Sequence, residues 1–199
     1  MELPSSRERH GDGCECAKIV EMTVFGDPNN FALIAESVRS WNESSGAGNG
    51  IFHFVVDGRI FPRRTRVSAL SADIGALSPG NALVDLPENS KIADLGAVDA
   101  FTLLLNGMLP YILLHEEEIP DDFETDYTYQ ASTCTLEDEN CFAFAVRVGE
   151  HVRVLAGEVE RDPSSDTRRV VDVAEACIHR NELSEMIGSV IRALRMAEL

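Results

Sequence analysis

The side chains best suited to bind a metal ion are His10, Cys14 and Cys16, near the start of the sequence. Thiolate and imidazole ligands of this kind favour zinc, but a zinc site normally has about four ligands and pairs its cysteines as Cys-x2–4-Cys. Here the pair is Cys-x-Cys, inside a polar and charged segment without hydrophobic periodicity. We therefore expect residues 1–16 to form a flexible tail without a bound metal.

Acid–base chemistry could use Asp27, His53 and His179, which lie far apart in the sequence. The sequence has no Gly-x-Ser-x-Gly, no glycine-rich phosphate loop and no His-Glu-x-x-His, so none of these side chains belongs to a catalytic motif. Asp27 lies between a glycine and a proline, a composition typical of a turn. We expect no catalytic residues and no cofactor. A small cytoplasmic enzyme with a site assembled from these scattered side chains stays open as an alternative.

The sequence contains five cysteines, so they cannot all form intramolecular disulfides. Its N-terminus does not resemble a secretory signal, and no apolar run approaches the ~20 residues that a membrane helix needs. These observations predict a cytoplasmic protein with reduced thiols. Cys134 and Cys141 flank a predicted turn and could face each other across a hairpin, but we expect both to be reduced and partly buried. Cys177 is expected in the core.

Charge is the most unusual property of the sequence. Its 17 Lys and Arg stand against 34 Asp and Glu, for a formal net charge of −17. This balance argues against direct binding to nucleic acid or to an anionic membrane, and it suits a basic partner. The charged side chains of residues 92–146 are all Asp or Glu, with no Lys or Arg, whereas the densest basic patch is Arg63-Arg64-Thr65-Arg66.

The densest acidic stretch is residues 116–126, and it has two interpretations. A run of charges is most often a solvated loop. Alternatively, the basic side chains of a partner would relieve its self-repulsion, while Ile119, Pro120 and Phe123 would supply apolar contact. The candidate partner-binding residues are Glu116, Glu117, Glu118, Asp121, Asp122, Phe123, Glu124 and Asp126.

A β-hairpin is the clearest of the elements that must position these residues. Residues 51–56 are rich in aromatic and β-branched side chains, which favour strands. Asp57-Gly58 follows, and an Asp-Gly pair between two apolar runs favours a type I′ turn. A Ser/Gly segment at 44–50 leads into the hairpin. Residues 31–38 fit a strand or a short helix, and we expect a strand paired with residues 51–56.

Other elements follow from periodicity and turn composition. Ser71 is a candidate N-cap for the first of two helices. Residues 127–134, 141–148 and 151–159 alternate between apolar and polar side chains with tight turns between them, which predicts an antiparallel meander. The predicted strands are 17–25, 127–134, 141–148, 151–159 and 169–179, the predicted helices are 71–77 and 97–105, and residues 81–91 are expected to be connecting chain.

An amphipathic helix is predicted at residues 181–196, with Asn181 as its N-cap. Its apolar side chains fall on one face, which is expected to pack on a sheet. The fold class predicted from these elements is α+β, a mainly antiparallel β-sheet with a C-terminal helix packed on it, and residues 17–199 are expected to form one domain. The residues of the apolar stripe are Leu183, Met186, Ile187, Val190, Ile191 and Leu194.

Several short motifs, in their order along the chain, resemble those of the bacterial polymorphic-toxin immunity proteins, in particular immunity protein family forty-two. The resemblance extends over residues 24–194. The motifs are Phe25-Gly26-Asp27-Pro28, Phe31-Ala32-Leu33-Ile34, Trp41-Asn42, Asn49-Gly50-Ile51-Phe52-His53-Phe54, Asp57-Gly58, Phe61-Pro62, Phe142-Ala143-Phe144, Gly149-Glu150 and Val152-Arg153-Val154-Leu155-Ala156-Gly157.

The resemblance implies a cytoplasmic protein that binds and neutralises a toxin domain by stoichiometric protein–protein interaction. It implies no catalytic residues. The acidity of residues 116–126 is compatible with this function, because an acidic inhibitor associates rapidly with a basic toxin. A structural or adaptor module without a toxin partner is the remaining alternative.

Overall fold

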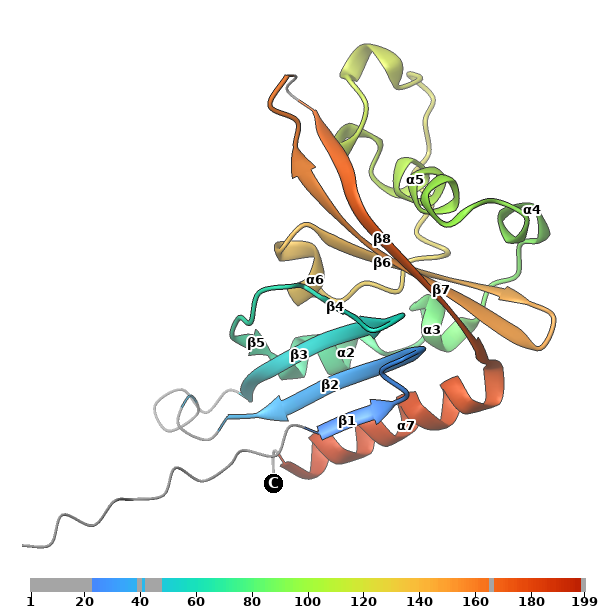
Figure 1. Cartoon of the computed structure of the whole chain (residues 1–199). Coiled ribbons are helices and arrows are strands. Elements are labelled where there is room, and N and C mark those ends of the chain that lie inside the picture. The colour runs from blue at the N-terminus through green and yellow to red at the C-terminus, as the bar shows by residue number, and fades with distance from the viewer. Residues whose placement is uncertain (1–22, 39–40, 42–47, 165–166, 198–199) are drawn as a thin grey trace, which may run out of the picture.

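The computed structural model describes residues 23–38, 41, 48–164 and 167–197. The fold is α+β, with two antiparallel sheets and a C-terminal helix (Figure 1). The predicted tail, its His10-Cys14-Cys16 cluster and most of the Ser/Gly segment lie outside the described residues. The five-stranded first sheet contains β1 (Thr23–Gly26), β2 (Phe31–Ser37), β3 (Asn49–Val56), β4 (Arg59–Phe61) and β5 (Ser68–Ala69), and the three-stranded second sheet contains β6 (Cys141–Val148), β7 (His151–Arg161) and β8 (Arg168–His179).

The predicted hairpin is confirmed as β3–β4. Asp57 and Gly58 both have positive φ, at 50° and 72°, as a type I′ turn requires. The expected strand at residues 31–38 is also confirmed, because β2 pairs antiparallel with β3 in a register that places Ile34 opposite His53. The described part of the strand predicted at 17–25 is β1, which pairs with β2.

The strand predicted at residues 127–134 is wrong. This segment makes one isolated bridge, between Gln130 and Phe144, and then enters helix α6 (Cys134–Asp138). The segment runs along the edge of β6, where the Ala131 amide donates to the Ala143 carbonyl at 2.9 Å, but it forms no continuous ladder with that strand. The meander of the second sheet is β6-β7-β8, so its third strand is the one predicted at 169–179.

The helices before the second sheet differ from the prediction at their ends. Ser71 is not an N-cap but lies inside its helix, which begins after Ala69 without a side-chain cap. Residues 81–91 are not plain connecting chain, because Asn81 and Asn89 accept backbone hydrogen bonds and start two short helices. The helices are α2 (Leu70–Ala76), α3 (Ala82–Asp85), α4 (Ser90–Ala93) and α5 (Ala97–Met108), followed by the 3-10 turns η1 (Pro110–Ile112) and η2 (Glu116–Glu118).

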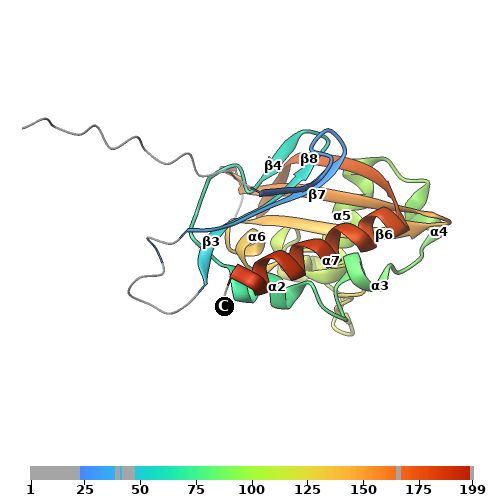
Figure 2. The same ribbon diagram turned by 90° about the horizontal axis from the view of Figure 1, so that it is seen from below.

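The predicted C-terminal helix is confirmed as α7 (Arg180–Ala197), and its predicted apolar stripe is buried apart from the half-buried Ile191. Asn181 is not its N-cap, because the helix already begins at Arg180 and the Asn181 amide donates to His179 Nδ1 at 3.3 Å. Figure 2 shows α7 running alongside α2 and α3 beneath the strands. No helix in the described part of the chain is long and apolar enough to span a membrane.

Two large hydrophobic cores, beside a small cluster of Ala32, Ile34 and Val55 on the first sheet, contain the buried apolar side chains of the described residues. The larger core lies between the two sheets and includes α2, α3 and α7. The smaller core joins the opposite face of the second sheet to α4, α5 and η1. The Phe101 ring of α5 approaches β7 so closely that a Cβ on Gly157 would lie 2.6 Å from its Cζ atom. The smaller core therefore fixes α5, and with it the acidic chain that follows.

Candidate functional site

The acidic stretch follows directly from α5 and is ordered by local backbone contacts. Glu116–Glu118 form η2, in which the His115 amide donates to Glu118 Oε2 at 2.9 Å. Further along, the Phe123 amide donates to the Pro120 carbonyl at 3.0 Å, and the Asp126 amide donates to the Gly107 carbonyl of α5 at 2.8 Å. The stretch is therefore tied at both ends to the α5 unit.

The predicted partner-binding side chains fall into two groups. Glu118 accepts from His115, and Asp126 Oδ1 accepts from the Thr128 amide at 2.9 Å, so these two carboxylates stabilise the turns. Phe123 is half-buried. The remaining carboxylates are exposed and make no hydrogen bond or ion pair with any residue that the structure describes; they are Glu116, Glu117, Asp121, Asp122 and Glu124.

Exposed apolar side chains lie on the same part of the chain. Tyr111 of η1 is 66% exposed, Leu103 of α5 is 53% exposed, and Tyr127, next to Asp126, is 47% exposed. Sequence reasoning missed them, because it predicted a helix at 97–105 and a strand at 127–134 without asking which of their apolar side chains would stay exposed. Three consecutive leucines at 103–105 were the available signal, since one helix face cannot bury all of them. We call the surface of α5, η1, η2 and residues 119–128 the acidic platform.

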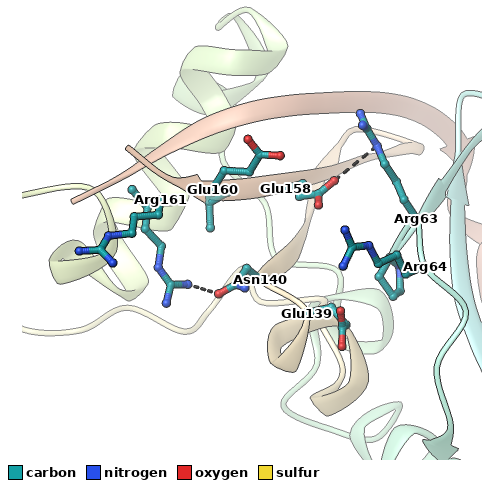
Figure 3. Close-up of a pocket in the computed structure, with 10 residues that line it drawn as sticks. Arg63, Arg64, Glu139, Asn140, Glu158, Glu160 and Arg161 are labelled. Carbon is teal, nitrogen blue, oxygen red and sulfur yellow. Dashed lines mark hydrogen bonds and ion pairs between the residues drawn. The ribbon is translucent and has the colours of Figure 1, made fainter. Parts of the chain in front are cut away.

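The second site is a cleft of about 710 Å³ beside the end of β4, the end of α6 and the outer part of β7 (Figure 3). We call it the arginine cleft. Arg63 and Arg64 come from the predicted basic patch, whereas Arg161 and Arg168 come from the end of the β7–β8 hairpin. The hairpin arginines were not predicted, because their place beside Arg64 depends on how the two sheets pack.

Part of the cleft is already neutralised. Arg63 pairs with Glu158, at 3.4 Å between Nε and Oε2, and its hydrogen bond to Asp172 raises the pKa of its guanidinium. Glu139 pairs with Arg66 at 2.8 Å. Figure 3 shows the Arg63–Glu158 pair on one wall, with the Arg64 side chain extending into the space between Glu139 and Glu158.

The three scattered catalytic candidates do not form a site. Asp27 Oδ1 accepts from the Asn29 amide at 2.9 Å, as the turn interpretation predicts. His53 is buried, with Nδ1 3.0 Å from the Pro62 carbonyl oxygen, and burial lowers its pKa. The His179 ring packs edge-on against His151, with the centroids 5.6 Å apart. No contact among the described residues joins any two of the three.

The described cysteines are free. Cys141 is buried, whereas Cys134 and Cys177 are exposed, so the predicted partial burial of Cys134 and core position of Cys177 are wrong. Cys134 and Cys141 also do not face each other across a hairpin, because Cys134 begins α6. Within the described ranges, no three His, Cys, Asp or Glu side chains are grouped so that they could hold a metal ion.

Comparison with known proteins adds a family and a fold. The family model for immunity protein 42 matches residues 22–193. The crystal structure of CdiI from Burkholderia dolosa AUO158 superposes with a TM-score of 0.67 and 20% sequence identity, covering 86% of this chain and 99% of that one. At this identity the similarity shows a shared fold. No curated protein sequence matches the chain.

Proposed function

Because this chain belongs to the immunity protein 42 family and so neutralises a toxin, we propose that it binds its cognate toxin domain through the acidic platform. The observation that carries this proposal is the combination of exposed, unpaired carboxylates with exposed Tyr111, Leu103 and Tyr127 on one ordered unit. A solvated loop would explain the carboxylates alone. It would not explain why the same ordered unit leaves large apolar side chains exposed to water.

The chemistry of the platform favours a basic toxin surface. Glu116, Glu117 and Asp121 repel one another, and Lys or Arg side chains from a partner would remove that repulsion. Their carboxylates have no partner among the residues that the structure describes, so new ion pairs with a toxin would disrupt no contact in this part of the chain. Tyr111 and Leu103 would supply the burial, since aromatic residues are enriched in the cores of interfaces.

We propose that the protein acts in the cytoplasm, where it neutralises the toxin by stoichiometric binding and catalyses no reaction. The three scattered acid–base candidates are engaged in a turn, a buried hydrogen bond and a ring contact. An enzymatic role for them would need a rearrangement of the sheet residues that hold them. We therefore favour occlusion of the toxin by the platform over chemical modification of it.

The test measures association with a catalytically inactive form of the toxin domain that co-purifies with this chain. The double variant Glu116→Lys/Glu117→Lys should slow association severalfold at low salt, and the difference should shrink at high salt, because exposed charges are screened beyond ~8–10 Å. Glu118 is left unchanged because it holds its turn.

A matched control makes the same charge change elsewhere. Glu182 and Glu185 are exposed on α7, so Glu182→Lys/Glu185→Lys alters the net charge equally without touching the platform. If both double variants slow association to the same extent, the effect is one of overall charge and the platform is not the binding surface.

A further inference from the structure

The arginine cleft has more positive charge than its own carboxylates neutralise. Glu139 and Glu158 are already paired with Arg66 and Arg63. Arg64 makes no hydrogen bond or ion pair within the part of the chain that the structure describes. Arg168 donates to the side-chain oxygen of Asn140, a neutral acceptor. In a chain of net charge −17, two guanidinium groups without a carboxylate partner in one cleft are unusual.

We propose that the arginine cleft is a second contact site for the toxin and that it binds a carboxylate-bearing segment of the toxin between Arg64 and Arg168. This inference rests on the proposed function, since it takes the toxin as the partner. A guanidinium presents paired N–H donors that match the two oxygens of a carboxylate. A cleft of about 710 Å³ is large enough for a short loop carrying one acidic side chain.

The lining of the cleft favours a protein carboxylate over a nucleic acid. None of its lining residues is aromatic, so it offers no surface on which a base could stack. Glu160 also lines the cleft, and it would repel a phosphate backbone with its repeated charges more strongly than it repels one carboxylate. The same Glu160 can accept a backbone N–H from a bound loop.

The cleft and the acidic platform lie on two sides of the same hairpin. Val159 and Val170, near the outer end of β7–β8, pack into the smaller core with α5. Glu158 and Glu160 of the same stretch line the cleft. Figure 1 shows this end of the hairpin projecting between the chain that follows α5 and the β4–α6 region. One toxin molecule that straddles the hairpin end would reach both sites.

The two sites would then have different roles. An acidic platform attracts any basic protein, so it gives rapid association but little discrimination. A cleft with unpaired arginines penalises a partner that offers it no carboxylate, because the guanidinium groups would lose water without gaining an ion pair. The arginine cleft is therefore the element that selects the cognate toxin.

The test is a charge reversal whose sign separates the two kinds of contact. Arg64→Glu should speed dissociation of the inactive toxin domain roughly tenfold or more, as expected for loss of a close charge pair across an interface. If the cleft instead faced a basic toxin surface, the same change would tighten binding. Arg64 has no partner among the described residues, so the melting temperature of the Arg64→Glu variant should equal that of the parent protein. An unchanged melting temperature would exclude misfolding as the cause of faster dissociation.

Arg169→Glu is the matched control, since Arg169 is exposed on the same hairpin but does not line the cleft. It should leave dissociation within about twofold of the parent protein. A toxin Asp→Arg or Glu→Arg substitution that restores binding only to Arg64→Glu would identify the bound carboxylate. If the parent protein binds the toxin and Arg64→Glu binds it equally well, this inference alone is overturned. If the parent protein does not bind the toxin, the proposed function is overturned.

Discussion

Arg59 on β4 and Asp172 on β8 join the two sheets directly, because Arg59 Nη1 donates to Asp172 Oδ1 at 2.7 Å. The same Nη1 donates to the Val173 carbonyl at 3.0 Å, and Arg63 donates to the other oxygen of Asp172. One carboxylate of β8 thus accepts hydrogen bonds from two arginines, one on β4 and one in the chain that follows it.

Replacing Asp172 tests this junction. Asp172→Ala should lower the free energy of unfolding by about 1 kcal/mol, because ion pairs with exposed arginines contribute ~0–1 kcal/mol each. The measurement is urea denaturation at low and high salt, with the larger loss at low salt. Glu182→Ala, at an exposed site without this contact, is the control. Equal stability of the two variants at both salt concentrations would mean that packing alone holds the sheets.

Asp73 lies on the buried face of α2, is fully buried, and should be far more sensitive to replacement. Its carboxylate accepts from the Thr135 hydroxyl at 2.7 Å, from the Thr135 amide at 3.2 Å and from the Ser68 hydroxyl. Asp73→Ala leaves these donors unsatisfied and should cost about 3 kcal/mol. In a double-mutant cycle with Thr135→Val, the two losses should not add, because both remove the same hydrogen bond. Additive losses would exclude coupling between the two residues.

His53 predicts a pH dependence of stability. Burial holds its pKa below the ordinary value of 6.5 in the folded protein, and hydrogen bonds to the Pro62 and Phe61 carbonyls oppose this only in part. The unfolded chain therefore binds a proton at a higher pH than the folded chain does. The contribution of His53 to the free energy of unfolding should therefore be constant above about pH 6.5 and fall as the pH drops below it.

The control for this pH effect is His53→Gln, which retains a donor for the Pro62 carbonyl but does not titrate. Denaturation curves between pH ~5 and ~8 should show a weaker pH dependence in this variant than in the parent protein. Identical pH profiles would assign the effect to other groups.

The described thiols should differ in how rapidly they react with an alkylating reagent. Burial raises the pKa of Cys141 to about 12, with smaller contributions from Glu158 and Glu139, so almost no thiolate exists near neutral pH. Cys134 and Cys177 are exposed. Alkylation of the folded protein followed by peptide mass mapping should label Cys134 and Cys177 rapidly and Cys141 only after denaturation. Rapid labelling of Cys141 would show that the start of β6 opens.

Tyr111 tests the apolar part of the acidic platform. Tyr111→Ala should speed toxin dissociation roughly tenfold, since truncation of a buried interface tyrosine costs on the order of 1–2 kcal/mol. Association should change little, because no charge is altered. Val24→Ala is the control, as Val24 is an exposed apolar residue on β1. If the toxin dissociates from Tyr111→Ala and from Val24→Ala at similar rates, the platform binds it through electrostatic contacts only.

Local chemistry made parts of the fold predictable. Asp57-Gly58 identified the hairpin because few sequences tolerate two consecutive positive φ angles. The stripe from Leu183 to Leu194 identified α7 because its period matches the helix. The strand predicted at residues 127–134 failed because their sequence alternates as a strand would, whereas in the fold the segment meets β6 at one isolated bridge and buries residues 131–133 in succession before α6.

The candidate surfaces were predictable to different degrees. Charge composition identified the acidic stretch, but not which of its carboxylates serve the turns, as Glu118 does. The exposure of Tyr111 depends on how α5 sits on the second sheet. The arginine cleft could not be predicted from the sequence. Arg64 and Arg168 line the same cleft only because the two sheets pack together, and no local sequence pattern encodes how they pack.

Separation of the two cores also shapes how this chain can evolve. The α5 unit is held by its own buried residues, such as Phe101 and Leu105, whereas Tyr111 and Leu103 project away from them. If the toxin binds this surface as proposed, mutations at the projecting positions change what the surface recognises at little cost in folding stability. When the toxin changes, substitutions can accumulate on this surface. The buried residues of the sheets and α7 change more slowly, because close packing constrains them.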